Sequence, residues 1–192
     1  VAEVPVRIPA SRYAEWAMDV SKVKEGNRRP VPSRPYRAAR IGTEMHLWIE
    51  QGVYDEGPLE FTDSDALDDG VNIDELKATF LASRWNGLTP EHQEIEILLP
   101  QGRHIVVCKI DAVFNLDGRW TVVDWKTGAT PSTDEEKDIK AMQLVLYRRA
   151  FAAWKDIPVD DVDAILYYVK HDWEWAIEPD RLARLDALPI ID

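Results

Sequence analysis

Three consecutive runs of β-forming residues limit most strongly what this chain can fold into. They lie at 94–99, 103–114 and 119–125. The last two are joined by residues 115–119, which contain the Asp117-Gly118 pair typical of a β-hairpin. The pattern therefore predicts three antiparallel strands in sequence order.

Acidic residues occupy unusual positions on the last two of these strands. Asp111 lies between apolar neighbours, and Asp124 follows two valines and precedes Lys126 by two residues. Because side chains alternate along a strand, we expect Asp124 and Lys126 on one face and Trp125 on the other, with the hairpin placing Asp111 beside them. A buried carboxylate is costly unless it is paired or binds a cation. Two interpretations follow: a divalent-metal site suited to phosphodiester cleavage, or a buried ion pair with Lys126 or Lys109.

Two predicted helices add candidate groups. His46 and Glu50 are four residues apart and so share a helix face, from which the imidazole could bind a metal. Gln143 and Tyr147 have the same spacing and could bind a phosphate. Each pair also has an ordinary interpretation: a core or surface histidine, and an exposed glutamine beside a half-buried tyrosine. The His-Glu-x-x-His pattern of zinc proteases is absent from the sequence.

Other patterns predict helices and loops around these strands. Helices are expected at 11–20, 38–51, 72–85, 134–154 and 181–188, an irregular linker at 26–36, an acidic loop at 52–69, a loop at 128–133, a central strand at 162–169 and a fifth strand at 173–177. Ser11 is expected to cap the first helix, and Thr133 with Glu136 to form a capping box on the longest. The inward apolar residues are expected to be Tyr13, Trp16, Ala17 and Val20, then Ile41, Met45, Trp48 and Ile49, then Leu76, Phe80 and Leu81.

Composition narrows the class of protein. The 192 residues suffice for one sizeable core, and a net charge of −12 argues against a simple nucleic-acid binder. The single cysteine, Cys108, excludes a disulfide framework, a cysteine-based zinc site and a four-cysteine iron–sulfur cluster, and it favours a reducing, cytoplasmic setting. No membrane partner is expected, because the sequence has neither a long apolar run nor a signal-peptide pattern. Basic residues nevertheless gather before the helix at 38–51: Arg28, Arg29, Arg34, Arg37 and Arg40.

Taken together, these motifs resemble the RecB-like branch of the PD-(D/E)xK nucleases. The ordered set is Gly42-Thr43-x-x-His46-x-x-x-Glu50, Glu94, Lys109-Ile-Asp111-Ala-Val-Phe, Val-Val-Asp124-Trp-Lys126-Thr-Gly128 and Gln143-x-x-x-Tyr147. The chain looks most similar to the C-terminal nuclease domain of actinobacterial AdnAB-type, UvrD-like helicase–nucleases. Many relatives carry four cysteines that hold an iron–sulfur cluster; this chain lacks them, so no such cluster is expected.

The resemblance implies an α/β fold with a restriction-endonuclease-like mixed sheet, an αβββαβ core flanked by helices, and an extra helical N-terminal segment. It implies a single nuclease domain over residues 1–192, with a helix and a basic, proline-rich linker in 1–36 and the core in 37–192. The start at Val1 without Met suggests a domain excised from a longer helicase–nuclease.

The resemblance also implies roles for individual residues. The metal ligands would be His46, Asp111, Asp124 and the carbonyl oxygen of Trp125, with Glu94 and Glu50 as possible further ligands or supporting groups. The catalytic residues would be Asp111, Asp124, Lys126, Gln143 and Tyr147. Contacts to nucleic acid would come from Arg37, Arg40 and Thr127.

The expected function is a Mg²⁺- or Mn²⁺-dependent DNase. Its substrate would be single-stranded DNA delivered by a helicase motor in the same chain, with a second helicase–nuclease subunit as partner, during DNA end resection and recombinational repair. The expected location is the cytoplasm, in association with the nucleoid. Two alternatives stay open: a non-catalytic module that docks on DNA ends or on a partner, and a stand-alone nuclease for RNA or branched DNA.

Overall fold

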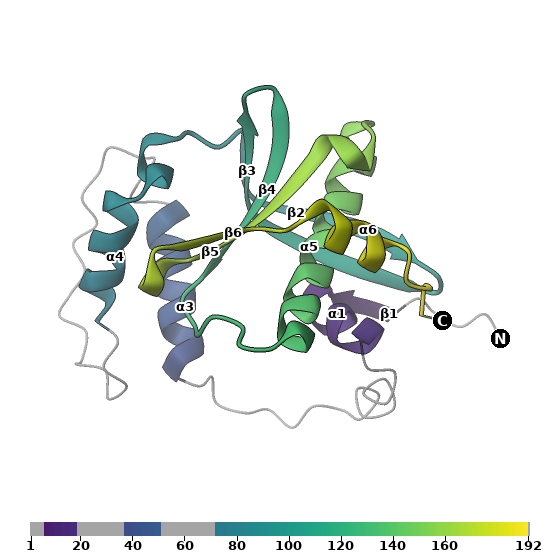
Figure 1. Cartoon of the computed structure of the whole chain (residues 1–192), viewed down its shortest axis with the longest axis horizontal. Coiled ribbons are helices and arrows are strands. Elements are labelled where there is room, and N and C mark those ends of the chain that lie inside the picture. The colour runs from purple at the N-terminus through teal and green to yellow at the C-terminus, as the bar shows by residue number, and fades with distance from the viewer. Residues whose placement is uncertain (1–5, 19–36, 51–71, 192) are drawn as a thin grey trace.

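The computed structural model describes residues 6–18, 37–50 and 72–191, which form one mixed sheet with helices on both faces (Figure 1). The strands are β1 (Val6–Pro9), β2 (His92–Gln101), β3 (His104–Leu116), β4 (Arg119–Lys126), β5 (Val162–Tyr168) and β6 (Trp173–Ala176). The α-helices are α1 (Ala10–Met18), α3 (Arg37–Trp48), α4 (Ile73–Ala82), α5 (Asp134–Lys155) and α6 (Pro179–Asp186), and short 3₁₀ helices are η2 (Arg84–Gly87), η3 (Val159–Asp161) and η4 (Val169–His171). The expected α/β class is confirmed. Among the helices described, none has the length and apolarity needed to cross a bilayer.

Strand β3 organises the sheet. It pairs antiparallel with β2 along residues 104–113, parallel with β1 at 104–107 and antiparallel with β4 at 112–116. Next to β4 lies β5, which is parallel to it, and β6 pairs antiparallel with β5. The three predicted antiparallel strands, the internal position of β5 and the strand at β6 are thus confirmed. The sequence does not predict β1, because a four-residue strand next to proline carries little local signal and finds its partner far along the chain.

Two local predictions are confirmed in detail. Asp117 and Gly118 connect β3 to β4 with φ angles of 52° and 86°, and two successive positive φ angles are the mark of a type I′ hairpin turn. At the start of α5, the Thr133 hydroxyl accepts a hydrogen bond from the N–H of Glu136 at 3.1 Å, and the Glu136 carboxylate accepts one from the N–H of Thr133. This reciprocal pairing is the predicted capping box.

Two other predictions are wrong. Helix α1 begins at Ala10, directly after β1, so Ser11 lies inside the first turn and is not the N-cap. Leu81 is 48% exposed, whereas Leu76 and Phe80 are buried. Leu76 and Phe80 are four residues apart and share a face, whereas Leu81 is rotated about 100° from Phe80 around the helix axis. The linker at 26–36 and the acidic loop at 52–69 lie outside the described residues.

Helices cover the sheet from two sides. The α5 face is the side on which α1, α5 and α6 pack, and the α3 face is the side covered by α3 and α4 (Figure 1). The N-terminal segment belongs to the same core as α5, because Ile8, Tyr13 and Trp16 are buried with it. On the α3 face the core includes Met45, Ile49, Leu76, Phe80, Trp85, Phe114, Val123, Trp125 and Tyr167.

The alternation of faces along β3 shifts by one residue at Asp111. Cys108 and Ile110 pack on the α5 face, as alternation requires, but Ala112 packs on the α3 face and Val113 on the α5 face. The pairing of β3 with β2 keeps one register on both sides of this point, so the shift involves no extra residue in either strand. Asp111 is therefore located where β3 changes the face that its residues present.

Candidate active site

Three carboxylates lie side by side across β2, β3 and β4. The β2–β3 register places Glu94 opposite Asp111, and the β3–β4 register, extended by one residue, places Asp111 opposite Asp124. We call Glu94, Asp111 and Asp124 the carboxylate row. Like charges in opposite positions destabilise a sheet, so this arrangement needs positive charge nearby.

Glu94 has an unusual backbone conformation. Its φ of 47° lies in the left-handed region, which costs a non-glycine residue roughly 1 kcal/mol. His92 and Ile95, three residues apart, both pack on the α5 face, so the alternation of β2 also shifts near Glu94. Strained backbone of this kind gathers at functional sites. Both strands of the pair therefore change face at their acidic residues.

His46 on α3 brings an imidazole to the carboxylate row. Its Nδ1 lies 3.3 Å from Oδ1 of Asp111 and 3.9 Å from Oε1 of Glu94. Its Nε2 donates to the carbonyl oxygen of Trp125 at 2.9 Å. Asp111 is itself held in place, because its Oδ2 accepts the N–H of Trp125 at 2.8 Å where β3 and β4 stop pairing. A hydrogen bond at one ring nitrogen fixes which nitrogen faces a metal, so Nδ1 is the imidazole atom presented to the row.

The pKa values reflect this crowding of charge. Burial raises the pKa of Asp111 to about 6, and the charge of Asp124 adds to the rise, against the opposing effect of His46. Burial tends to lower the pKa of His46, but the hydrogen bond to Asp111 and the charges of Asp111 and Asp124 outweigh it and raise the pKa to about 9. Perturbed groups of this kind are typical of functional sites.

Lys126 pairs with the last member of the row. Its Nζ lies 2.6 Å from Oδ2 of Asp124, an oxygen that makes no well-aligned hydrogen bond with any described residue. The Asp124 side chain is only 4% exposed. Trp125, between them in sequence, packs its ring on the α3 face, so the predicted alternation holds. The ion pair between Asp124 and Lys126 considered from the sequence is present, whereas Lys109 pairs with Glu94 instead of Asp111.

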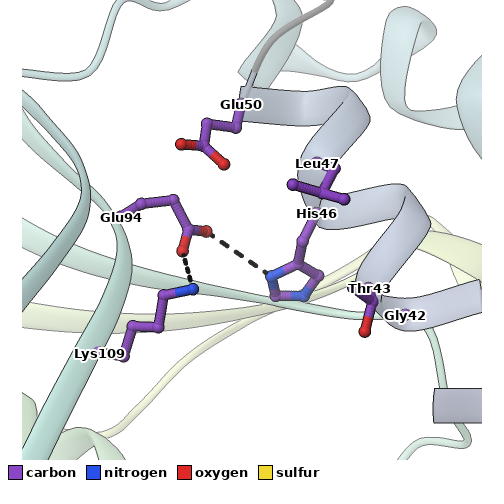
Figure 2. A pocket seen from close by; sticks show the side chains of 7 residues that line it. All are labelled: Gly42, Thr43, His46, Leu47, Glu50, Glu94 and Lys109. Atoms are coloured by element: carbon purple, nitrogen blue, oxygen red, sulfur yellow. Dashed lines mark ion pairs between the residues drawn. The ribbon is translucent and has the colours of Figure 1, made fainter. Parts of the chain in front are cut away.

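A pocket of about 280 Å³ opens beside the row on the α3 face. Figure 2 shows Glu94 between Lys109 and the His46 ring, with Glu50 above them. Oε2 of Glu94 lies 2.6 Å from Nζ of Lys109, which is largely exposed. The pocket is also lined by Gly42, Thr43 and Leu47, and it leaves the His46 and Glu94 side chains partly exposed.

From the α5 face, Gln143 and Tyr147 approach the row. Both are buried, and Nε2 of Gln143 donates to the hydroxyl of Tyr147 at 2.8 Å. Burial and the charges of Asp124 and Asp111 raise the pKa of Tyr147 well above its ordinary value. Tyr147 therefore stays a neutral hydroxyl beside the carboxylates at physiological pH.

The donor set suits a divalent cation. Ligand atoms of His46, Glu94 and Asp111 all lie within 4.8 Å of one another, and carboxylate oxygens with one imidazole are ligands for Mg²⁺ or Mn²⁺. The buried, crowded carboxylates supply the negative charge that such an ion neutralises. Asp124 lies beside this trio but outside it, since its Oδ2 faces Lys126. The Trp125 carbonyl already accepts one bond from His46 and has a second lone pair, so the roles of Asp124 and Trp125 as ligands remain predictions.

The predicted nucleic-acid contacts have different outcomes. Arg37 and Arg40 belong to α3, but their side chains lie outside the described part of the chain. Thr127 directly follows β4, and its Oγ1 is 3.3 Å from where a Cβ on Gly42 would lie. A glycine at 42 thus lets α3 approach the segment that follows Lys126.

Sequence reasoning did not single out Lys140. This lysine of α5 shares a helix face with Gln143 and Tyr147, because it precedes them by three and seven residues. That spacing is the signal that could have identified it, since a helix face that presents two candidate site residues presents a third at the same period.

Comparison with known proteins agrees with this geometry. A search of curated proteins found no match. The sequence model of the PD-(D/E)XK nuclease superfamily matches residues 16–184, a span that includes the carboxylate row, His46, Lys126 and the Gln143–Tyr147 pair. The structure agrees with this match in its mixed sheet, in the carboxylate row and in the lysine two residues beyond Asp124. The chain therefore belongs to the PD-(D/E)XK nuclease superfamily, whose members are metal-dependent nucleases.

Proposed function

We propose that this chain hydrolyses phosphodiester bonds of single-stranded DNA with the help of Mg²⁺ or Mn²⁺, on a strand delivered by a helicase motor during DNA end resection and recombinational repair. The observation that carries the proposal is the carboxylate row with His46 at one side and Lys126 at its end. Imidazole is a better ligand for Mn²⁺ than for Mg²⁺, so Mn²⁺ is expected to support the reaction well.

The residues of this chain would divide the work as follows. His46, Glu94 and Asp111 would hold the cation, with Asp124 and the Trp125 carbonyl as further ligands. A divalent cation, when bound there, lowers the pKa of a water and neutralises charge on phosphate oxygens. The Lys126 ammonium would contact the attacking water or the scissile phosphate and offset the charge that develops on it. The buried Tyr147 hydroxyl, held by Gln143, would donate to an oxygen at the same place.

The overall charge supports the idea of a delivered substrate. At −12 the chain attracts polyanions weakly, so we propose that a motor domain and a second helicase–nuclease subunit bring the strand to the pocket beside His46. The alternative is a DNA-end or partner-docking module that binds without cutting, and it too would rely on a partner, because the net charge disfavours autonomous DNA binding.

The test compares labelled single-stranded DNA, duplex DNA and RNA, each with Mg²⁺, Mn²⁺ or EDTA. We expect metal-dependent cleavage of single-stranded DNA, and a loss of about 100-fold or more in Asp111→Asn and in Asp124→Asn. Asp163→Asn is the matched control, because Asp163 pairs with Arg119 at the other end of β4 and β5.

Four results would count against parts of the proposal. Equal cleavage in EDTA would refute metal dependence, and near-normal cleavage by Asp111→Asn or Asp124→Asn would refute the role of that residue. Faster cleavage of RNA than of single-stranded DNA would make RNA the substrate. Binding of DNA without cleavage, even with the motor subunit added, would favour the docking module.

A further inference from the structure

Lys140 is a half-buried lysine on the side of α5 that faces the active site. It lies one turn before Gln143 and two turns before Tyr147, and these two residues reach the carboxylate row from the same helix. Its ammonium is close enough to Lys126 and Asp124 to sense both charges. The structure thus brings a second lysine to the α5 side of the site.

The ammonium of Lys140 has no close partner in the part of the chain that the structure describes. The charged groups around it are Lys126, Asp124, Glu15 on α1 and Glu136 on α5, and none of them forms an ion pair or hydrogen bond with it. Asp124 is already paired with Lys126. The carboxylate of Glu136 accepts hydrogen bonds from Ser132 and Thr133 in the capping box.

The other lysines of α5 are placed differently. Lys137 pairs with Asp134 at 3.9 Å, and Lys155 lies over the Trp120 ring, 4.8 Å from its centre, at the far end of the helix. Burial and the like charge of Lys126 lower the pKa of Lys140. Lys140 is therefore the lysine of α5 that lies on the site face and has no close partner among the described residues, so its ammonium is available to an anionic group of the substrate.

We propose that Lys140 binds a phosphate of the nucleic-acid substrate adjacent to the scissile one, on the α5 side of Lys126. This inference rests on the proposed function, because it assumes that the scissile phosphate lies between the carboxylate row and Lys126. The strand would then cross the site from the pocket beside His46 towards α5, with Lys126 and Lys140 contacting successive phosphates. Lys140 would position the strand and leave the bond-breaking step to the other residues.

The test uses Lys140→Met, Lys140→Arg and the control Lys155→Met, which changes the net charge equally at the other end of the same helix. Fluorescence anisotropy with a labelled single-stranded oligodeoxynucleotide in EDTA gives the Kd and its salt dependence, and cleavage with Mn²⁺ gives KM and kcat. For Lys140→Met we expect a rise of about tenfold in Kd and KM, a salt slope smaller by about 0.7, and kcat within about twofold of the parent. Lys140→Arg should restore binding, and Lys155→Met should behave as the parent.

Thermal unfolding excludes a structural explanation. Removing a half-buried, unpaired ammonium should leave the melting temperature unchanged or raise it, so a weakly binding Lys140→Met with a normal melting temperature supports the proposal. Equal Kd, KM and salt slope in Lys140→Met and Lys155→Met would overturn it. If Lys140→Met binds the oligonucleotide more weakly but the parent cleaves nothing, the nuclease proposal alone is refuted. If the parent and Lys140→Met cleave with the same KM, the phosphate contact alone is refuted.

Discussion

Replacing Lys126 by methionine removes the cation that the structure pairs with Asp124. The two charged atoms are 2.6 Å apart, and the Asp124 side chain is 4% exposed. Methionine keeps most of the aliphatic length of lysine, so the substitution mainly deletes charge. In the metal-free protein, Asp124 would then be buried beside Asp111, and among the described residues His46 and Lys140 would be left to balance the two carboxylates.

The expected cost follows from burial. Removing one partner of a buried ion pair destabilises a protein by about 3–5 kcal/mol. We therefore expect Lys126→Met to lower the free energy of unfolding by about 3–5 kcal/mol. With a typical slope of about 2 kcal/mol per molar urea, the midpoint of unfolding would fall by about 2 M.

Urea unfolding in EDTA, followed by tryptophan fluorescence, measures this change. Lys137→Met is the matched control: its lysine pairs with Asp134 at 3.9 Å, and the Asp134 side chain is 84% exposed, so its loss should cost at most about 1 kcal/mol. A divalent cation replaces the missing positive charge, so Mn²⁺ should stabilise Lys126→Met more than the parent. The reasoning is refuted if Lys126→Met in EDTA unfolds within about 1 kcal/mol of the parent, or if Mn²⁺ stabilises both equally.

Three further predictions concern stability. Phe80→Ala should lower the free energy of unfolding by about 3–5 kcal/mol, because Phe80 is fully buried and meets three aromatic rings edge-on. Leu81→Ala, next to it but 48% exposed, should cost under about 1 kcal/mol; equal urea midpoints for these two variants would contradict the packing of α4. Thr133→Ala should cost about 1 kcal/mol by removing the N-cap of α5, and an unchanged midpoint would mean that the cap contributes nothing. Arg119 holds the pKa of Asp163 below its ordinary value, so Asp163 contributes stability above pH about 4 that is lost on further acidification. The difference in the free energy of unfolding between the parent and Asp163→Asn should therefore shrink as the pH falls through that range. A difference that grows instead would contradict this prediction.

Much of the fold could be predicted because its signals are local. The Asp117-Gly118 turn depends on two neighbouring residues that adopt positive φ, and the cap of α5 depends on Thr133 and Glu136, three residues apart. The alternation of Asp124, Trp125 and Lys126 follows from strand geometry alone. By contrast, β1 has no local signal and is defined by its pairing with β3.

The candidate site was predictable as a set of residue types but not as an arrangement. From the sequence, Lys109 could have paired with Asp111, and only packing directed it to Glu94. Strict alternation does not predict the shift of faces at Asp111, because such a shift depends on how the two strands fit the helices on either side. Leu81 likewise looked apolar enough to be buried, yet the helix turns Leu76 and Phe80 towards the core and leaves Leu81 exposed.

The amino-acid sequence by itself determined which chemical groups are available and the secondary structure that carries them, since turns, caps and periodicity act between near neighbours. Only the tertiary structure decided that His46 touches Asp111, that Asp124 is neutralised by Lys126, and that Lys140 beside them has no close partner among the described residues. The reason is that each of these contacts depends on several charged side chains lying within a few ångströms of one another, and only the folded chain brings them that close.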